Sequence, residues 1–411
     1  MKFLFFPSPA HGHVNPMLPL ARELVSRGDE VLIYLTREFE PVVRATGATH
    51  RMLDDTFGIP SLPGIGGKPP DMMRALPLIL KVTNQGLREA PRLAEQARAE
   101  RADGVLYDPM ALWGIAVAGM LRLPSAIFNT TFVGTPLVRR ELRKNFKTRP
   151  PLKSLWGILG VMWTSELLHW RHGAPRVGLL SAFSAVADLH IVPVPRSYQP
   201  DAGSLDARYV FVGPSVTSRG DWGDFPLEQL EGSPVLYISL GTTPLNQRTD
   251  FYTACFQAFR DTPWKVVMAC GRNLDPTSLG AAPPNFIVRQ QVPQLEVLSR
   301  ARVMLTHGGM NSIMESLWYG VPLAVFPQAA DQPFNAQRVS ELGLGIALTA
   351  HEALDPKALR DTVERLDTEP AYRERVTRFQ KELREAGGAQ RAADALHQFV
   401  ATRQGAHRKR A

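Results

Sequence analysis

Cysteine and long hydrophobic runs are scarce in this chain of 411 residues. Its two cysteines, Cys255 and Cys270, lie in apolar surroundings and form neither a CxxC pair nor a Cys/His cluster. The apolar residues 3–6 are too few for a signal peptide and are followed by Pro7. No stretch reaches the roughly 18 apolar residues of a membrane span. These absences predict a reduced, cytoplasmic protein.

Motifs that mark several enzyme classes are also missing. The sequence contains no GxSxG, HExxH or Walker motif, so nothing supports a serine hydrolase, a zinc protease or an NTPase. It lacks a nucleic-acid-binding motif, so we expect no nucleic-acid partner. With 44% hydrophobic and 21% charged residues, the composition is that of a globular chain long enough for two domains.

Positive charge, in contrast, is in excess. The formal net charge is +8, and a basic run interrupted only by Glu141 precedes the apolar residues 155–163. Such a run indicates either a solvated surface or contact with anionic lipid or an acidic partner, so a peripheral membrane contact through 139–163 stays open. The run consists of Arg139, Arg140, Arg143, Lys144, Lys147, Arg149 and Lys153, and a second basic stretch lies at 407–410.

Short apolar runs alternate with helical patterns in both halves of the chain. Such alternation is typical of βαβ units around a parallel sheet. In the first half we expect helices at 16–27 and 112–121 and strands at 2–6, 30–35, 104–107 and 125–128. In the second half the expected strands lie within 234–241, 264–271, 285–291, 301–309 and 321–328.

The architecture predicted from this alternation is α/β, with two Rossmann-like doubly wound domains facing each other. A ligand is expected in the interdomain cleft, at the carboxyl ends of the strands. Residues 58–70 are rich in Gly and Pro and should be loop, and 139–175 should be a helical insertion. The expected segments are an N-terminal domain at 1–205, a linker at 206–230, a second domain at 231–385, and a C-terminal helix with a basic tail at 386–411.

The first candidate site is the segment HGHVNPM, which follows the first expected strand. Two imidazoles flank Gly12. Asn15 is a favourable helix N-cap and Pro16 suits the first helical position, so this pair should fix the loop that presents His13. A lone loop histidine is more often structural than catalytic, and we assign His11 to the loop or to a wall of the cleft.

The second candidate site is the segment THGGMNSIMES, which begins at Thr306. Gly308 and Gly309 form a turn after a strand, and Asn311-Ser312 open a helix. The N–H groups at a helix N-terminus favour an anion, and a diphosphate is the natural guest.

Polar side chains around this turn suit the remainder of a nucleotide-linked ligand. His307 can donate a hydrogen bond to a phosphate. Glu315 lies one turn into the helix, where it can accept from ribose hydroxyls. Asp331 and Gln332 follow the next strand and offer acceptors and donors to sugar hydroxyls. Each feature is weak by itself, but the ordered set is specific.

In this order, the segments resemble the donor-binding signature of UDP-dependent glycosyltransferases of GT-B architecture. Five further segments occur in the order typical of that family, and the similarity covers nearly the whole chain. They are HGHVNPMLPLARELVSRG, FVGPS, VLYISLGT, RQQVPQLEVL and ELGLG. It is closest to the bacterial macrolide glycosyltransferase subfamily, whose members glucosylate macrolides, flavonoids and other hydrophobic phenols or alcohols. The resemblance implies transfer of a hexose from a UDP-sugar, UDP-glucose first, to a hydrophobic small-molecule acceptor.

The resemblance also implies roles for individual residues. His13 matches the general base of the family, and Asp108 in GVLYDPMALWG matches the acidic residue that orients it. A neutral imidazole with its ordinary pKa near 6.5 can accept a hydroxyl proton, and Asp108 would stabilise the imidazolium. The donor-binding residues implied are Thr130, Thr131, Thr242, Gln291, Val292, His307, Gly309, Asn311, Ser312, Glu315, Asp331 and Gln332.

Two aspects of specificity stay open at this point. Many family members carry Trp where this chain has Gln291, and that indole stacks on uracil. Both UDP and TDP donors are therefore considered, with the backbone of Val292 available to the base edge. A broad apolar acceptor wall is expected in the N-terminal domain, although core packing explains the same residues as well. Its candidates are Phe132, Trp156, Met162 and Trp163.

No metal or cofactor besides the UDP-sugar co-substrate is expected, because the chain lacks the Asp-x-Asp motif that carries the metal in the other nucleotide-sugar transferase architecture. Direct displacement would invert the anomeric centre and give a β-glucoside. Three alternatives are a membrane-surface glycosyltransferase for a lipid or carotenoid alcohol, a nucleotide-sugar epimerase, and a non-catalytic UDP-sugar binder. An epimerase would not need the HGHVNP loop and would convert the donor without an acceptor, and retention of His13 and Asp108 disfavours the binder.

Overall fold

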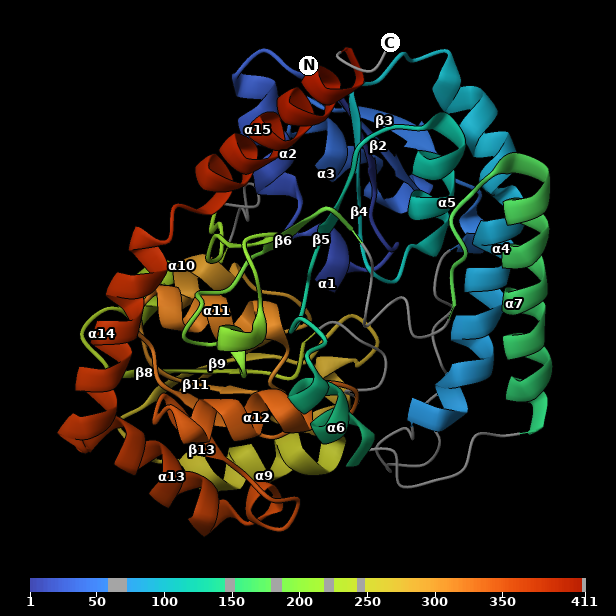
Figure 1. Cartoon of the computed structure of the whole chain (residues 1–411). Coiled ribbons are helices and arrows are strands. Elements are labelled where there is room, and N and C mark those ends of the chain that lie inside the picture. The colour runs from blue at the N-terminus through green and yellow to red at the C-terminus, as the bar shows by residue number, and fades with distance from the viewer. Residues whose placement is uncertain (58–71, 145–151, 179–186, 218–224, 242–247, 409–411) are drawn as a thin grey trace. The chain divides into compact units, whose positions relative to one another are not determined.

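The chain forms two compact units, each built around one parallel sheet (Figure 1). The computed structural model describes residues 1–57, 72–144, 152–178, 187–217, 225–241 and 248–408. Most of unit 1 is Met72–Ser215 together with the first and last segments of the chain, whereas unit 2 contains Val216–Glu385. The loop expected at 58–70 lies outside the described residues.

Seven strands form the sheet of unit 1 in the order β3-β2-β1-β4-β5-β6-β7, and all neighbours pair in parallel. The first six positions follow the Rossmann order, in which the direction of winding reverses between β1 and β4. The strands are β1 (Lys2–Phe6), β2 (Glu30–Leu35), β3 (Thr49–Met52), β4 (Gly104–Tyr107), β5 (Ser125–Phe128), β6 (Leu189–Val192) and β7 (Tyr209–Phe211).

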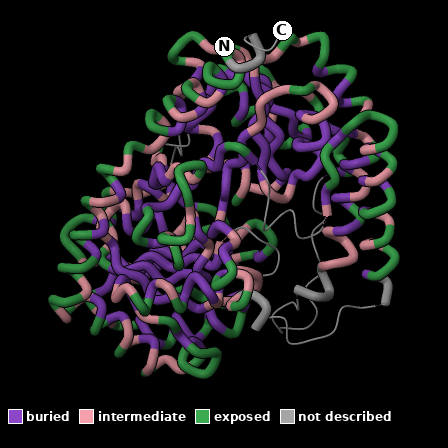
Figure 2. Tube along the Cα trace, in the orientation of Figure 1, coloured by how far each residue is buried: buried purple, intermediate pink, exposed green. Residues whose placement is uncertain are grey.

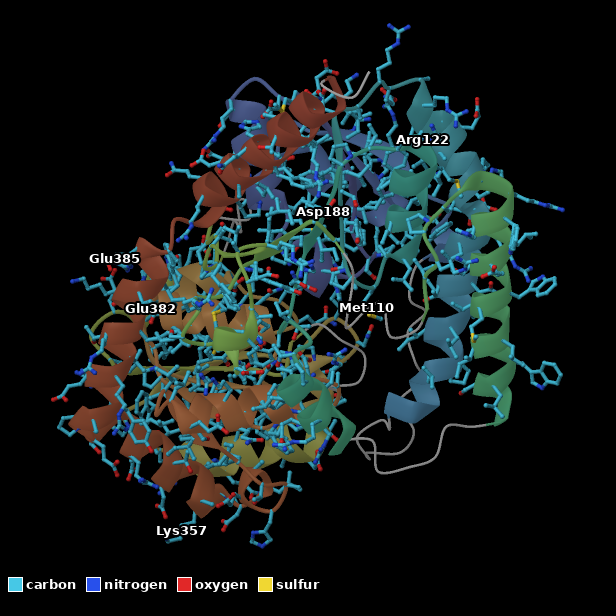
Figure 3. All side chains as sticks on the ribbon, viewed as in Figure 1. Met110, Arg122, Asp188, Lys357, Glu382 and Glu385 are labelled. Carbon is cyan, nitrogen blue, oxygen red and sulfur yellow. The ribbon has the colours of Figure 1, made fainter. Side chains whose placement is uncertain are left out.

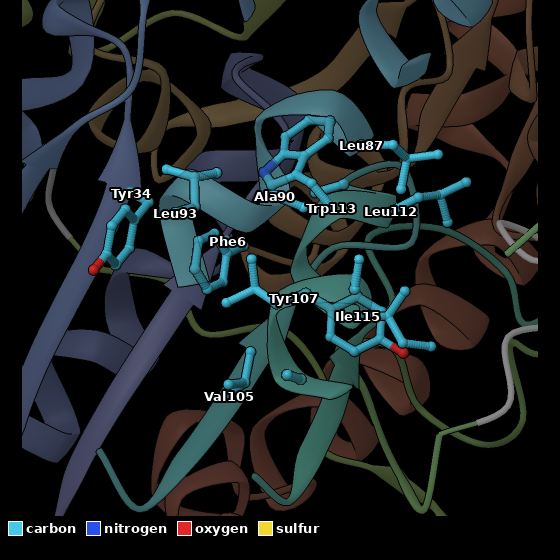
Figure 4. Close-up of a cluster of buried hydrophobic side chains, with 14 of the residues drawn as sticks. Phe6, Tyr34, Leu87, Ala90, Leu93, Val105, Tyr107, Leu112, Trp113 and Ile115 are labelled. Carbon is cyan, nitrogen blue, oxygen red and sulfur yellow. The ribbon is translucent and has the colours of Figure 1, made fainter. Parts of the chain in front are cut away.

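Unit 1 contains helices on both sides of this sheet, one of them in an outer layer. They are α1 (His11–Val14), α2 (Leu18–Ser26), α3 (Glu40–Arg44), α4 (Met72–Arg98), α5 (Leu112–Leu121), α6 (Pro136–Lys144), α7 (Leu152–His172) and α15 (Gly388–Arg408), with 3₁₀ turns at Arg37–Phe39, Asp55–Phe57 and Ala202–Ser204. Successive residues of β1 point to opposite faces. Phe3 and Phe5 share a core with α2 and α15, whereas Leu4 and Phe6 share one with α4 and α5 (Figure 4).

Unit 2 repeats the same topology with six parallel strands in the order β10-β9-β8-β11-β12-β13. Its winding reverses between β8 and β11. The strands are β8 (Val235–Ser239), β9 (Lys265–Ala269), β10 (Phe286–Arg289), β11 (Ala301–Thr306), β12 (Leu323–Val325) and β13 (Gly345–Ala347). The helices are α9 (Thr249–Phe259), α10 (Gln294–Leu298), α11 (Met310–Trp318), α12 (Gln332–Glu341), α13 (Pro356–Thr368) and α14 (Pro370–Glu385), with 3₁₀ turns at Leu227–Leu230, Pro276–Leu279 and Glu352–Leu354.

The interior strands of both sheets are almost entirely buried, as expected when helices cover both faces of a parallel sheet (Figure 2). Charged side chains such as Lys357 and Glu385 stand on the outer surface of unit 2 instead (Figure 3). All nine strands expected from the sequence are present, whereas β3, β6, β7 and β13 were not anticipated.

The chain leaves unit 1 after Ser215 and returns to it after Glu385. Strand β7 therefore lies inside the segment expected to be linker, because it completes the edge of the first sheet beside β6. The C-terminal α15 packs on α2 and forms part of unit 1. His397 Nε2 lies 2.6 Å from Asp29 Oδ2, and Arg403 forms an ion pair with Asp188 at 2.7 Å.

The helical insertion expected at 139–175 contains α6 and α7. Helix α7 lies along α4, which in turn packs on α5 (Figure 1). It is therefore a further layer outside the helices that cover the sheet. Among the helices that the structure describes, none is long and apolar enough to cross a membrane.

Candidate functional site

The winding reversal of unit 1 brings together two residues that are 95 positions apart in sequence. His13 lies on α1, which follows β1, and Asp108 directly follows β4. Because β1 and β4 are neighbours in the sheet, both segments emerge at the same carboxyl edge. His13 Nδ1 lies 2.7 Å from Asp108 Oδ2.

Asp108 is fully buried and its carboxylate is well satisfied. Oδ1 accepts a hydrogen bond from the backbone N–H of Met110 at 2.8 Å, and Oδ2 faces His13. A carboxylate can only accept, so Nδ1 of His13 carries the proton in this contact. The neutral ring then has its lone pair on Nε2, and the His13 side chain is 28% exposed. This tautomer can accept a proton at its outer nitrogen.

A third residue, Thr130, joins the pair. Its hydroxyl lies 3.0 Å from His13 Nδ1 and donates to Asp108 Oδ2 at 3.2 Å. Thr130 follows β5, the next strand after β4 in the sheet. The sequence placed Thr130 and Thr131 near a donor diphosphate. The contact with the histidine–aspartate pair was missed because it depends on strand order; Thr131 is half-buried beside it.

The local structure around His13 differs from the expectation in one respect. Asn15 is the C-cap of α1, and α2 begins at Leu18 after the N-cap Met17. The expected N-cap role of Asn15, with Pro16 as first helical residue, is therefore wrong. The short α1 turn itself carries His13 to Asp108. His11 is the first residue of α1 and packs edge-on against the Phe39 ring, with centroids 5.0 Å apart.

The winding reversal of unit 2 carries a different arrangement. His307 follows β11 and lies between two glycine turns, one at Gly241 after β8 and one at Gly309. A Cβ atom on Gly241 would lie 2.6 Å from His307 Cε1, and one on Gly309 would lie 2.6 Å from His307 Nε2. Both positions therefore need glycine to leave room for the imidazole. Burial lowers the pKa of His307 to about 4, so the ring is neutral at ordinary pH.

Helix α11 starts immediately after this histidine, with Gly309 as its N-cap. Asn311 and Ser312 are half-buried residues of its first turn. The first N–H groups of a helix point away from its body, and the helix dipole adds partial positive charge there. This end of α11 can therefore hold an anionic group such as a diphosphate.

Glu315 is buried on α11 and belongs to a hydrogen-bonded chain that sequence reasoning missed. Tyr237 on β8 donates to Gln294 Oε1 at 2.9 Å, and Gln294 Nε2 donates to Glu315 Oε2 at 2.5 Å. The chain holds the Glu315 carboxylate in one orientation. No local motif indicated this chain, because it joins residues of β8, α10 and α11.

Asp331 and Gln332 lie after β12, and the structure ties both to their surroundings. Gln332 Oε1 accepts from the backbone N–H groups of Gln328 at 2.8 Å and Ala329 at 3.0 Å. Asn335 Nδ2 donates to Asp331 Oδ2 at 3.2 Å and also to the carbonyl of Gly308. The amide of Gln332 thus keeps its NH₂ group for other partners, whereas its oxygen supports the loop.

The remaining predicted residues have separate environments. Gln291 is exposed between β10 and α10, and Val292 beside it is buried. Phe132 is buried and stacked on Tyr198. In contrast, three candidates for the acceptor wall stand exposed on α7, so the four do not share one environment. These three are Trp156, Met162 and Trp163. Thr242 lies outside the described residues.

The structure holds no group of three or more His, Cys, Asp and Glu side chains able to bind a metal, within the residues described. Its chemistry is that of a histidine–carboxylate pair at one sheet and an anion-binding helix end beside a neutral histidine at the other. The first arrangement can accept a proton, and the second can hold an anionic group.

Comparison with known proteins identifies the family. Residues 263–397 match the family described as erythromycin biosynthesis protein CIII-like, C-terminal domain. The chain is 35% identical over 405 residues to the NDP-glycosyltransferase YjiC of Bacillus licheniformis, covering 96% of this chain and 97% of the relative. It is 29% identical to the oleandomycin glycosyltransferase of Streptomyces antibioticus, covering 95% and 89%. The solved structure of CalG4, the calicheamicin glycosyltransferase, matches with a TM-score of 0.78 and 33% identity over 97% of this chain and 98% of that chain.

The fold and the matches define a glycosyltransferase of GT-B architecture that uses a nucleoside diphosphate (NDP) sugar. The chain belongs to the NDP-glycosyltransferase family. The predicted family and the predicted pair of Rossmann-like sheets are confirmed. The residue roles, the sugar and the acceptor stay predictions.

Proposed function

We propose that the chain transfers glucose from UDP-glucose to a hydroxyl group of a hydrophobic natural product, with inversion at the anomeric carbon. The observation that carries the proposal is the 2.7 Å contact between His13 Nδ1 and the buried carboxylate of Asp108. The names of two relatives support a small-molecule acceptor, because they refer to oleandomycin and to calicheamicin.

His13 acts as the general base in this proposal. The acceptor oxygen attacks the anomeric carbon, its proton passes to His13 Nε2, and the bond from that carbon to the diphosphate oxygen breaks. Asp108 keeps the Nδ1 proton in place and stabilises the imidazolium that forms. The hydroxyl of Thr130 donates a second hydrogen bond to Asp108 Oδ2 and helps to hold the carboxylate in place. Displacement from the opposite face gives a β-glucoside from an α-linked donor.

Unit 2 binds the donor in this proposal. The diphosphate sits at the N-terminus of α11, where Asn311 and Ser312 begin the helix, and its growing charge is stabilised without rearrangement. His307 lies beside this helix end as a neutral ring whose N–H donates to the backbone of Ser239, so it lines the donor site without donating to the diphosphate. Glu315 accepts from the ribose, and Asp331 and Gln332 bind the glucose hydroxyls.

The base of the nucleotide is the least constrained part of the donor. Gln291 offers an amide rather than an aromatic face, so stacking on this residue is weak. The backbone beside the buried Val292 then carries most of the base recognition, which a thymine could also satisfy. Both cysteines are free and buried, which suits a reducing, cytoplasmic compartment.

The test is a coupled UDP-release assay on the purified chain in EDTA. UDP-glucose and TDP-glucose are each supplied with a panel of macrolides, flavonoids and carotenoid alcohols, and the product masses are measured by mass spectrometry. Acceptor-dependent release with a hexose mass gain supports transfer, and NMR coupling at the anomeric proton reports the configuration. Donor hydrolysis or epimerisation without acceptor modification would contradict the proposal, as would tight donor binding without any turnover across the panel.

A further inference from the structure

Helix α7 packs on the protein through Val161, Leu168 and several small residues, whereas its three tryptophans face solvent. Gly157 lies so close to α4 that a Cβ atom there would be 2.9 Å from Leu80 Cβ. Thr164 Oγ1 donates to Asn84 Oδ1 at 2.7 Å, and Ser165 Oγ accepts from the backbone of Val177 at 2.7 Å. These close contacts and hydrogen bonds fix which side of α7 faces the protein.

The outward side of α7 is dominated by tryptophan. Trp156, Trp163 and Trp170 recur every seven residues, which places them on one side of the helix. Their exposed fractions are 78%, 74% and 76%. Seven of the twelve exposed large hydrophobic residues among the described ones lie on this helix (Figure 2). The other four are Leu155, Leu159, Met162 and Leu167.

Such a surface is not explained by folding, because these side chains gain nothing from burial within the chain. Monomeric soluble proteins rarely expose so contiguous an apolar strip unless it contacts a partner. Tryptophan is the residue that favours the boundary between water and lipid, where its ring is apolar and its N–H stays polar. Here Trp170 Nε1 donates to Glu166 Oε1 at 2.6 Å, so its polar edge is already satisfied.

Charge identifies the kind of partner. By sequence, the segment 139–187 contains nine Lys and Arg but only two acidic residues, and so holds most of the excess charge of the chain. One of the two, Glu166, is paired with Arg176 at 2.8 Å. Arg171 and His172 end the helix in exposed positions. A second copy of the same surface would bring like charges together, whereas an anionic surface would complement them.

We propose that the outward side of α7 is a peripheral docking surface for an anionic lipid bilayer. The three indoles enter the headgroup boundary, and the exposed Arg171 at the end of the helix attracts the lipid phosphates. The helix lies in the plane of the membrane rather than crossing it. This inference is separate from the proposed transferase reaction, since it needs neither donor nor acceptor.

The test is co-sedimentation of the full chain with vesicles, without donor or acceptor present. Vesicles of phosphatidylcholine alone are compared with vesicles that also contain phosphatidylglycerol. We expect binding to the anionic vesicles, weakened by added salt, and a loss of about tenfold or more in the triple variant Trp156→Ser, Trp163→Ser, Trp170→Ser. Arg171→Glu should weaken the binding further in the same direction.

Matched controls distinguish binding through this surface from non-specific hydrophobic binding. The double variant Met52→Ser, Leu354→Ser removes exposed apolar residues elsewhere and should bind vesicles like the native chain. Thermal melting checks that the triple variant is folded. The proposal is overturned if the native chain ignores anionic vesicles, or if the folded triple variant binds them equally. A native dimer in light scattering that the triple variant converts to monomer would also overturn it, in favour of a second copy as occupant.

Discussion

The two sheets wind in the same order, yet their reversal points carry opposite kinds of histidine. At the reversal in unit 1, His13 is partly exposed and contacts the carboxylate of Asp108 at 2.7 Å. At the equivalent place in unit 2, His307 is buried between glycine turns, and burial lowers its pKa to about 4. The same topology thus holds one imidazole against a buried carboxylate and the other in a buried site that keeps it neutral.

The comparison separates what the fold provides from what the side chains provide. The fold brings the segments after two neighbouring strands together at one edge of each sheet. A buried carboxylate in that place keeps an imidazole ready to take charge. Glycines in that place leave room for the ring, and burial keeps it neutral although it also contacts the backbone of Ser239.

The largest expected effect comes from removing the base of unit 1. His13→Ala should lower kcat by about 10²–10⁴-fold, because the acceptor proton then has no positioned acceptor. Asp108→Asn should approach this loss, since it favours the wrong tautomer. The measurement is UDP release with acceptor, alongside donor affinity by calorimetry. Donor affinity should persist in both variants; an undiminished kcat in His13→Ala would refute the role.

The next largest effect is expected from adding a methyl group beside His307 in unit 2, which should weaken donor binding. Gly309→Ala places a Cβ 2.6 Å from His307 Nε2 and must displace the ring or the helix start. Donor affinity should fall by about tenfold or more, in line with the cost of overpacking. Gly12→Ala in unit 1 is the matched control, because nothing lies within 4 Å of its Cβ. Equal donor affinities of the two variants, measured by calorimetry, would contradict this view of the cradle.

Acid should destabilise the chain through its buried neutral histidines. Burial lowers the pKa values of His307 and of His190 in unit 1 to about 4, from an ordinary 6.5. Between these values only the unfolded chain gains the protons, so stability is full above pH 6.5 and falls as the pH drops toward 4. Each histidine contributes up to about 1.4 kcal/mol per pH unit.

Urea unfolding at pH 7 and pH 5 measures this loss. The variant His307→Asn should show a smaller drop in the free energy of unfolding between the two pH values. The unfolded chain of this variant takes up one proton fewer, because it lacks one of the two histidines. An unchanged drop would mean that His307 is not held neutral in the folded chain.

The smallest expected effect concerns backbone strain beside the donor residues. Ala330 has a positive φ of +59°, in the region that favours glycine, directly before Asp331. In Ala330→Gly the relief of strain and the greater freedom of the unfolded chain oppose each other, so stability should change by less than about 1 kcal/mol. Ala329→Gly, without a positive φ to relieve, should be the less stable of the two in thermal melting.

The strands that the sequence predicted are those buried on both faces. Runs such as residues 2–6 and 235–239 are apolar throughout, which is the pattern of an interior parallel strand. Strand β3 escaped prediction because it lies at a sheet edge, and its Thr49 and Met52 are exposed. Strand β13 is short, contains Gly345 and also lies at an edge, so it has neither the length nor the pattern of a strand.

Site residues could be predicted where they belong to one local motif. Contacts between residues that only the order of the strands brings together were missed. The segment around His307 has its glycines and helix start within a few residues. The contact of Thr130 with His13 joins positions 117 apart, through the ends of β5 and β1. The hold of Gln294 on Glu315 likewise crosses from one helix to another. Such contacts depend on which strands are neighbours, and periodicity alone does not reveal that.

The return of α15 to unit 1 has a consequence for building hybrid enzymes. A donor-binding module exchanged between relatives cannot be joined at a single seam, because the last helix must stay with the N-terminal sheet that it covers. Its partners are Asp29, Asp103 and Asp188, all in unit 1. The natural unit to exchange is 216–385, inserted into a host that supplies both flanks, because a chimera with an exchanged tail would carry a foreign helix against the sheet of unit 1.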